Sequence, residues 1–346
     1  MKLCLRCNQY FQDEVKLCPT DRVALEFVGK DPLIGALINN RFAVDAVIGK
    51  GASGIVYKAS RLIMGGKVAI KVLHACPDMD PKSLDKFHRE VTALENLRHP
   101  NIVNLWESGM TVDKQPYLVM DYIEGISLSD VISSMGRLPA DRIIDITQQV
   151  CHGLTEAHRQ GFVHRDIKPE NIVLDSSSSQ DFVKLCDFGI SYSAFENNLP
   201  KASQPATVSG SPAYMSPEQC RGLPLTPKSD IYSLALVVFE MFTGRRPVVA
   251  NSSKEYMLKT VKEKLPLMNT VAPQLGIPEP VDLVVAKALQ KNPQDRQVSA
   301  QHFADDLAAA CYGSGFACIK GAKQKHIEGL QKQVGRVSER LGGQNP

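Results

Sequence analysis

The stretch VHRDIKPENIVL at residues 163–174 constrains the fold of this chain more than any other segment. Within eight positions it holds six polar or charged side chains: His164, Arg165, Asp166, Lys168, Glu170 and Asn171. A solvated surface loop is the commoner explanation for a charge cluster of this kind. Here the cluster lies between a helical apolar pattern and an apolar run, which indicates that the chain directs these groups toward a defined place.

Composition narrows the class of protein. Of the 346 residues, 43% are hydrophobic and 22% are charged, as in soluble globular domains. The net charge of +3 is too small to indicate a nucleic-acid or membrane partner. No uncharged apolar run reaches the roughly 18 residues of a membrane span, and the first residues, MKLCLRC, lack the apolar core of a signal peptide. We therefore expect a cytoplasmic protein with no nucleic-acid partner and no membrane span.

Hydrophobic periodicity changes along the chain. Residues 41–120 contain mainly β-rich runs, with helical spacing at 82–97. Residues 190–213 have no periodicity and predict a long loop, a feature that is often functional inside a compact domain. From about residue 127 the pattern is mostly helical, and helices are expected at 139–160, 228–244, 254–264, 279–290 and 299–312. The sequence thus predicts a small β-rich lobe followed by a larger α-rich lobe.

A glycine cluster opens the β-rich part. Gly49, Gly51 and Gly54 fit the pattern G-x-G-x-x-G-x-V, which ends at Val56. Glycines allow a backbone to approach phosphates closely, because no Cβ intervenes. A Rossmann glycine turn leads into a helix, whereas this cluster leads into the strand-like run IVYKAS. The context therefore favours a hairpin that covers a nucleotide.

Two charged residues follow the glycine cluster. Lys71 lies in the middle of the apolar run KVAIKVL, and Glu90 lies on the predicted helix 19 residues later. If that helix packs on the strand, Glu90 can pair with Lys71 and hold it extended toward phosphate oxygens. The alternative is an edge lysine whose stem is buried and whose amine reaches solvent.

The opening stretch supplies the groups that phosphoryl transfer needs. Asp166 offers a carboxylate for a substrate hydroxyl, and Lys168 is close enough in sequence to neutralise a transferring phosphoryl group. Asn171 and Asp187 offer oxygen ligands of the kind that Mg²⁺ prefers. Phosphoryl transfer depends on positioning and charge neutralisation more than on covalent chemistry by the protein.

These motifs identify a resemblance. Residues 41–310 resemble the catalytic domain of Ser/Thr protein kinases, in the style of the bacterial eukaryotic-like (Hanks-type) enzymes. Five motifs occur in the family's order: GKGASG, VAIK, HRDIKPEN, DFG, and SPE at 216–218 in place of A-P-E. The resemblance implies an α+β, bilobal protein kinase fold, with a β-rich N-lobe and a helical C-lobe. It also implies ATP and Mg²⁺ as cofactors, with Mn²⁺ as a substitute, and protein substrates that include the chain itself.

The resemblance also implies residue roles. Asp166 would be the catalytic base, Lys168 would contact the γ-phosphate, Asn171 and Asp187 would hold Mg²⁺, and Lys71 would pair with Glu90. Met120 would be the gatekeeper, and the backbones of Asp121 and Ile123 would bond the adenine edge. The implied ATP-binding positions are Ile48, Gly49, Gly51, Gly54, Val56, Ala69, Lys71, Met120, Asp121, Ile123 and Val173. Two structural features are implied as well: a buried Glu218–Arg296 ion pair, and Asp230 as the brace of the catalytic loop.

The long loop suggests substrate type and regulation. Lys168 and Ser211 follow the Ser/Thr pattern of the family rather than the tyrosine pattern. A buried Arg165 beside the base could bond a phosphate on this loop, with Thr207 as first acceptor and Ser203 and Ser209 next. An unphosphorylated loop is the alternative. A pseudokinase scaffold that binds ATP and partners is the alternative for the whole chain, although no catalytic position is replaced. Ala235 stands where the family usually has glycine.

The two ends lie outside the kinase-like region. At the N-terminus, C-x₂-C and C-x₂-D knuckles resemble a zinc ribbon, so Cys4, Cys7, Cys18 and Asp21 could bind Zn²⁺. A metal-free ribbon is the alternative. At the C-terminus, a basic tail with apolar 3–4 spacing from Ile327 to Leu341 predicts a short amphipathic helix. The expected divisions are a ribbon at 1–28, a linker at 29–40, a kinase domain at 41–311 and the tail at 312–346.

Overall fold

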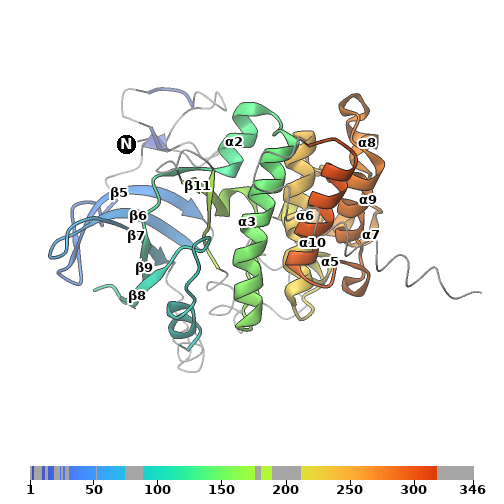
Figure 1. Ribbon diagram of the computed structural model, residues 1–346. Coiled ribbons are helices and arrows are strands. Elements are labelled where there is room, and N and C mark those ends of the chain that lie inside the picture. The colour runs from blue at the N-terminus through green and yellow to red at the C-terminus, as the bar shows by residue number, and fades with distance from the viewer. Residues whose placement is uncertain are drawn as a thin grey trace, which may run out of the picture. The chain divides into compact units, whose positions relative to one another are not determined.

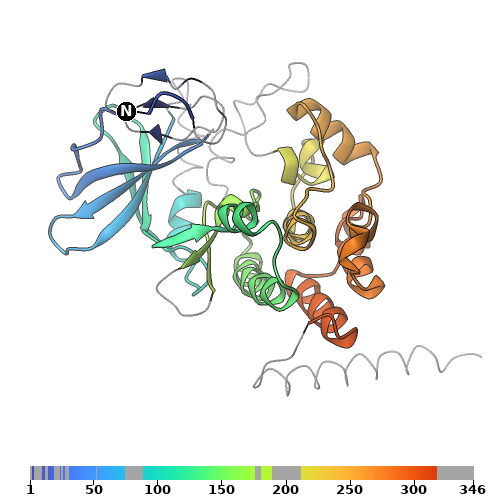
Figure 2. The same cartoon turned by 90° about the horizontal axis from the view of Figure 1, so that it is seen from above.

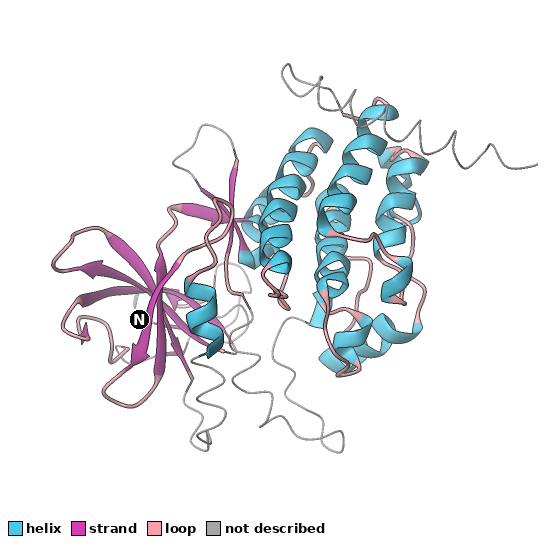
Figure 3. Cartoon of the chain, turned by 60° about the horizontal axis from the view of Figure 1, so that its bottom comes forward, coloured by secondary structure: helices cyan, strands magenta, loops and turns pink. Residues whose placement is uncertain are grey.

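The computed structural model describes residues 2–3, 10–11, 15–18, 24, 26–27, 31–51, 53–74, 89–175, 181–188 and 212–317. The chain divides into two compact units, Met1–Glu95 with Asn104–Tyr122, and Asn96–Val103 with Ile123–Pro346. Strands dominate the first unit and helices the second, as Figures 1 and 3 show. The predicted succession of a β-rich and an α-rich part is therefore confirmed.

The first unit is built on a six-stranded antiparallel sheet in the order β4-β5-β6-β7-β9-β8. Its strands are β4 (Leu37–Ile38), β5 (Phe42–Gly51), β6 (Gly54–Arg61), β7 (Lys67–Leu73), β8 (Leu105–Met110) and β9 (Pro116–Asp121). Residues 89–95 are helical, within the helix that the spacing at 82–97 predicts. A smaller antiparallel sheet near the N-terminus joins β1 (Lys2–Leu3) to β2 (Tyr10–Phe11) and β3 (Glu26–Phe27).

The segment expected to be a linker contributes to the six-stranded sheet. β4 pairs with β5 through Leu37–Ala43 and Ile38–Phe42. Asn39 and Asn40 make this hairpin possible, because both adopt the positive φ values (50° and 53°) that asparagine tolerates in tight turns. Asp31 anchors the segment further, since its carboxylate accepts a hydrogen bond from the Tyr57 hydroxyl at 3.0 Å. The β-rich unit therefore begins before position 41.

The two faces of the six-stranded sheet have different surroundings. Successive side chains of a strand point to opposite faces. On one face lies an apolar cluster formed by Ile38, Phe42, Val44, Tyr57, Ala59, Val68, Ile70, Val72, Tyr117 and Val119. Ala69 and Lys71 alternate with the β7 members of this cluster and so lie on the opposite face. One face thus holds the core of the unit, and the other carries the lysine predicted to bind phosphate.

The second unit combines a small sheet with a set of helices. The antiparallel sheet has the order β10-β11-β12, from Gly125–Ser127, Ile172–Asp175 and Phe182–Leu185. The helices are α2 (Leu128–Met135), α3 (Ala140–Arg159), α5 (Pro217–Cys220), α6 (Pro227–Thr243), α7 (Ser253–Lys262), α8 (Met268–Val271), α9 (Glu279–Ala288) and α10 (Ala300–Gly313). The five helices expected from periodicity are therefore confirmed as α3, α6, α7, α9 and α10, with small shifts at their ends.

Helix α6 forms the centre of this unit. It is apolar on all sides, and every residue from Ser229 to Phe239 is buried, as expected of a helix enclosed by others. It packs against α3, α9 and α10, and α3 and α10 run side by side (Figures 1 and 2). Ala235, where the family usually has glycine, is fully buried within this packing. No helix in the described part of the chain is both long and apolar enough to cross a membrane.

Candidate active site

The backbone of the stretch 163–174 is fixed by one buried carboxylate. Asp230 lies in the first turn of α6 and is 1% exposed. Its Oδ2 accepts hydrogen bonds from the backbone N–H of His164 (2.8 Å) and from Nε2 of His158 (2.7 Å), and its Oδ1 accepts one from the N–H of Arg165 (2.9 Å). Hydrogen bonds to a charged acceptor are about twice as strong as neutral ones. The central helix therefore braces the loop, as the resemblance implies.

His164 connects this loop to the DFG segment. Its ring is fully buried, and burial lowers the pKa of the imidazole, which favours the neutral form. The N–H of Asp166 donates to Nδ1 (3.3 Å), so the ring proton lies on Nε2, which donates to the carbonyl of Cys186 (2.9 Å). The Phe188 ring packs against the imidazole with centroids 4.4 Å apart. His164 thus acts as a structural bridge rather than as a proton carrier.

Three of the predicted catalytic side chains meet in the second unit. Nζ of Lys168 lies 2.6 Å from Oδ2 of Asp166, and Nδ2 of Asn171 donates to the same oxygen at 3.0 Å and to the Asp166 carbonyl at 2.8 Å. Asn171 is buried, whereas the Asp166 side chain keeps 31% of its surface exposed. The carboxylate is therefore held in place and still accessible to a substrate.

The charge of Lys168 is maintained by its neighbours. Burial alone would lower the pKa of this amine, but the carboxylates of Asp166, Glu170 and Asp187 raise it, and the net shift is upward. Lys168 consequently stays cationic at neutral pH. A fixed positive charge beside Asp166 suits a phosphoryl group whose oxygens gain negative charge in the transition state.

Two residues of this region have an unusual backbone conformation. Arg165 and Asp187 adopt positive φ values of 69° and 57°. Non-glycine residues with positive φ are uncommon and concentrate at functional sites. The conformation of Arg165 is held by Asp230 at its N–H and by Nε2 of Gln219, which donates to its carbonyl at 2.7 Å. The Arg165 side chain is half-buried, so our expectation of a buried arginine is wrong. Its backbone is tied to the buried Asp230 and to Gln219, while part of the residue stays exposed.

The residues predicted to hold Mg²⁺ fit that ion chemically. Because the Asn171 amide nitrogen bonds Asp166, its carbonyl oxygen is left as the group for a metal. Together with the carboxylate of Asp187 it gives a pair of hard oxygen ligands, and Mg²⁺ typically takes one or two protein ligands plus phosphates and water. Larger sets, of three or more His, Cys, Asp or Glu side chains that could hold a metal, do not occur among the described residues.

Five residues of the first unit that are predicted to bind the nucleotide lie on one face of its sheet. Val56 pairs with Gly49 and Lys71, and Lys71 also pairs with Leu118. Ala69 pairs with Met120 in the adjacent row. Directly paired residues share a face, so Gly49, Val56, Ala69, Lys71 and Met120 form one continuous surface opposite the apolar core. Lys71 is buried, and its pairing with Glu90, on the helical residues 89–95, stays a prediction.

The glycines of the β5–β6 hairpin have separate reasons to be glycine. A Cβ on Gly54 would lie 2.3 Å from the Val72 carbonyl oxygen, so strand packing requires its absence. A Cβ on Gly51 would meet nothing closer than 4.0 Å, so packing does not demand a glycine there. His74 steadies the turn, since its Nε2 lies 3.1 Å from the Gly51 carbonyl and its N–H donates to the Ser53 carbonyl. Packing therefore does not explain the glycine at position 51, and close approach of a ligand there stays a prediction.

The remaining predicted positions are either untested or outside the described residues. Ile48 lies within β5 and is 46% exposed. The side chain of Asp121 accepts hydrogen bonds from Asn104 and Trp106, which leaves the predicted role of its backbone untested. Ile123 and Val173 belong to the second unit. Cys18 is described and buried. The following fall outside the described residues: Cys4, Cys7, Asp21, Ser203, Thr207, Ser209 and Ser211.

Two further contributors to the loop were missed in the sequence. His158 is the third donor to Asp230, and Gln219 holds the Arg165 carbonyl. Gln219 also forms a capping box with Ser216 at the start of α5. The S-P-E-Q order was available as a capping signal, and it gives the serine that replaces alanine in A-P-E a structural role. No local pattern distinguishes His158 from a surface histidine near a helix end.

A family model for the protein kinase domain matches residues 42–307. The chain belongs to the protein kinase family. Among curated relatives of this kinase, the Serine/threonine-protein kinase pkn3 of Myxococcus xanthus is 34% identical over 281 residues, which cover 81% of this chain and 51% of the relative. The chain thus spans about half the length of that relative, and less of others.

Solved structures agree with the family. The kinase domain of Mycobacterium tuberculosis PknI is 29% identical, with a TM-score of 0.62, and the match covers 80% of this kinase and 98% of that chain. Residues 1–466 of Rad53, solved in complex with AMP-PNP, are 25% identical, with a TM-score of 0.61 and coverage of 76% and 64%. Both matches support the β-rich and helical composition of the kinase fold found here.

Proposed function

We propose that this chain is an ATP-dependent protein serine/threonine kinase that transfers the γ-phosphate of ATP to hydroxyl groups of protein substrates. The observation that carries the proposal is the cluster of Asp166, Lys168 and Asn171 on a loop held by Asp230. Relatives named as Ser/Thr protein kinases support the same activity. Every residue type that the chemistry requires is present in the sequence.

Asp166 would act on the substrate hydroxyl. Its Oδ2 is engaged by Lys168 and Asn171, so the accessible part of the carboxylate orients the hydroxyl and accepts its proton. The hydroxyl oxygen forms a bond to the γ-phosphorus while the bond from that phosphorus to the β–γ bridging oxygen breaks. ADP leaves, and the phosphate ester stays on the substrate.

Lys168 and the oxygen ligands would manage the charge. The amine of Lys168 is placed to contact the oxygens of the transferring group, whose charge grows during transfer. Asn171 and Asp187 would hold Mg²⁺, which neutralises phosphate oxygens when bound. In the first unit, Lys71 and the β5–β6 hairpin would bind ATP phosphates, and Val56, Ala69 and Met120 would contact the adenine. Their shared sheet face supports this assignment.

The decisive experiment incubates the purified chain with labelled ATP and Mg²⁺, alone and with a generic basic protein, and identifies the labelled amino acids. Label on serine and threonine, lost when Mg²⁺ is chelated, is the expected result. ATP binding without any transfer would instead identify a pseudokinase scaffold. Label on Thr207 in the chain itself would support regulation of the activity through a phosphate bound by Arg165. An Arg165→Gln variant whose kinase activity changes as much as that of the wild type when Thr207 is phosphorylated would refute this regulation.

We also propose that the N-terminal segment binds zinc through Cys4, Cys7, Cys18 and Asp21. The short antiparallel strands β1, β2 and β3 support a ribbon-like segment. So small a segment has little hydrophobic core of its own, and a bound metal would stabilise it. Metal analysis of the full chain should find one zinc ion per molecule, and Cys18→Ser should release it. An unchanged zinc content in that variant would argue against this ligand set.

A further inference from the structure

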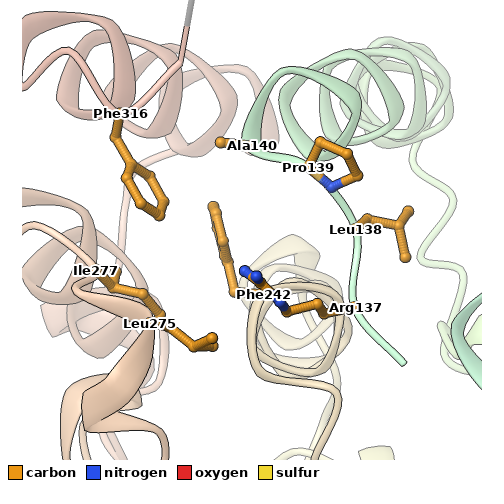
Figure 4. A pocket seen from close by; sticks show the side chains of 8 residues that line it. All are labelled: Arg137, Leu138, Pro139, Ala140, Phe242, Leu275, Ile277 and Phe316. Carbon is orange, nitrogen blue, oxygen red and sulfur yellow. The ribbon is translucent and has the colours of Figure 1, made fainter. Parts of the chain in front are cut away.

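A pocket of about 200 Å³, lined mostly by apolar side chains, lies in the second unit, at the C-terminal end of α6. Its walls come from the loop before α3, the end of α6, the segment after α8 and the residues after α10. Eight residues line it: Arg137, Leu138, Pro139, Ala140, Phe242, Leu275, Ile277 and Phe316. Figure 4 shows the side chains of Phe316, Ile277 and Leu275 on one side of Phe242, and Leu138 and Pro139 on the other.

The pocket is built by fixed contacts. The N–H of Leu138 donates to the Met241 carbonyl at 2.9 Å, which ties the loop before α3 to α6. Below this bond, Gly244 packs so closely on Gly136 that a Cβ would lie 2.1 Å from the Gly136 carbonyl oxygen. After α10 the N–H of Phe316 returns to the Cys311 carbonyl at 2.9 Å, and its ring lies 6.1 Å from that of Phe242.

The size of the pocket limits what it can hold. Engineered apolar cavities of about 150 Å³ bind benzene, whereas drug-sized ligands occupy roughly 300–1,000 Å³. A volume of about 200 Å³ therefore suits a short hydrocarbon chain or a single ring. Seven of the eight lining residues are apolar, which leaves Arg137 as the charged group of the lining.

The electrostatics of the mouth favour an anionic head group. Arg137 is exposed, and within the described part of the chain its guanidinium makes no ion pair. Ala140, which lines the pocket, is the first residue of α3, and the N-cap residue Pro139 has no side-chain cap, so the positive end of this helix lies beside the lining. Asp141, the acidic residue of that turn, accepts from the N–H of Arg142. A carboxylate would be attracted by both the guanidinium and the helix end.

Charge complementarity also decides against the chain's own tail as occupant. Residues 318–346 of the tail follow Phe316 in the chain, but they carry six Lys or Arg and only two Glu. A basic segment would meet Arg137 with like charge. We propose that this pocket binds a free medium-chain fatty acid, with its alkyl chain against the rings of Phe242 and Phe316 and its carboxylate at Arg137.

The test is calorimetric titration of the full chain with octanoate, hexanoate and 1-octanol. Each buried methylene should tighten binding about fourfold, so octanoate should bind roughly fifteenfold more tightly than hexanoate. Arg137→Gln should weaken octanoate about threefold, as expected for an exposed charge pair, and leave octanol unchanged. Equal affinities of the wild type for octanoate and octanol would overturn the carboxylate assignment.

Two variants locate the site. Ala140→Leu fills the pocket from the start of α3 and should weaken octanoate at least tenfold. Ala286→Leu makes the same change at a half-buried position of α9 outside the lining and should have no effect. Equal binding to both variants, or no binding to the wild type, would refute the site. A tenfold gain in octanoate affinity on replacing Ile327 and Leu330 by serine would show that the tail occupies the pocket instead.

Discussion

Replacing Asp230 by asparagine separates the bracing of the catalytic loop from general stability. The carboxylate accepts three hydrogen bonds, two from the backbone N–H groups of His164 and Arg165 and one from His158. An amide of the same shape offers only one acceptor oxygen. His158 can adapt by accepting through Nε2, but one of the two backbone N–H groups then faces an NH₂ group and is left without a partner.

The expected cost follows from this count. A hydrogen bond to a charged group contributes about 1.5–3 kcal/mol, and a buried donor left unsatisfied costs about 1–3 kcal/mol. We therefore expect Asp230→Asn to lower the free energy of unfolding by about 3 kcal/mol. Because the orphaned N–H belongs to the loop that carries Asp166, the loop should also shift. Misplacement by about 1 Å can cost a hundredfold in rate, so kcat should fall about a hundredfold.

Asp282 provides the matched control. It is equally buried, and its two oxygens accept from the backbone N–H groups of Met268 (2.8 Å) and Asn269 (3.0 Å), outside the catalytic loop. Urea unfolding should show a similar loss of stability for Asp282→Asn. Kinase assays at a temperature where both variants are folded should show a fall in kcat only for Asp230→Asn. Equal kcat values for the two variants would refute the bracing role.

Three further outcomes are expected. Arg296→Met leaves Glu218 buried without its bidentate partner, so the free energy of unfolding in urea should fall by about 3–5 kcal/mol. Adding Glu218→Gln should recover most of this loss. Equal losses in the single and double variants would contradict the prediction. Burial raises the pKa of Glu218, but the hydrogen bonds from Arg296 and Ser229 together lower it by more, so the net shift of this pKa is downward. The ion pair therefore stabilises the fold fully above the unfolded pKa of about 4.3, and this stabilisation is lost as pH falls through the folded pKa. Unfolding measured against pH should show the difference in stability between wild type and Arg296→Met narrowing in acid. A difference in stability that does not depend on pH would count against this ion pair. Gly54→Ala should destabilise the β5–β6 hairpin and raise KM for ATP, while Gly51→Ala should leave thermal stability unchanged. A larger loss of thermal stability in Gly51→Ala than in Gly54→Ala would show that the steric argument is wrong.

The sequence predicted the elements whose signal is local. The five helices expected after residue 127 and the two strands around the glycine cluster follow from hydrophobic spacing, which depends only on neighbours in the chain. The strand at Leu37–Ile38 was missed because its cue is two asparagines in a turn, and its burial depends on distant partners such as Tyr57. The short helix α2 has no separate pattern and is recognised by its Ser127 cap.

The candidate site shows the same division. The catalytic side chains lie close together in sequence, so Asp166, Lys168 and Asn171 could be grouped before any fold was known. The residues that hold them come from elsewhere, with Asp230 separated from His164 by 66 positions. Only the resemblance to the family pointed to Asp230, and nothing pointed to His158. The pocket beside Phe242 was invisible, because four separate segments create it.

The measurement closest to the central claim compares phosphate transfer and nucleotide binding in the wild type and in Asp166→Asn. The asparagine keeps the shape of the side chain and loses the proton acceptor, so nucleotide affinity should be unchanged. Transfer to serine and threonine should fall by at least a hundredfold, within the range of general base catalysis. Transfer that persists in Asp166→Asn at the wild-type rate would contradict the assignment of Asp166 as the base and, with it, the proposed mechanism.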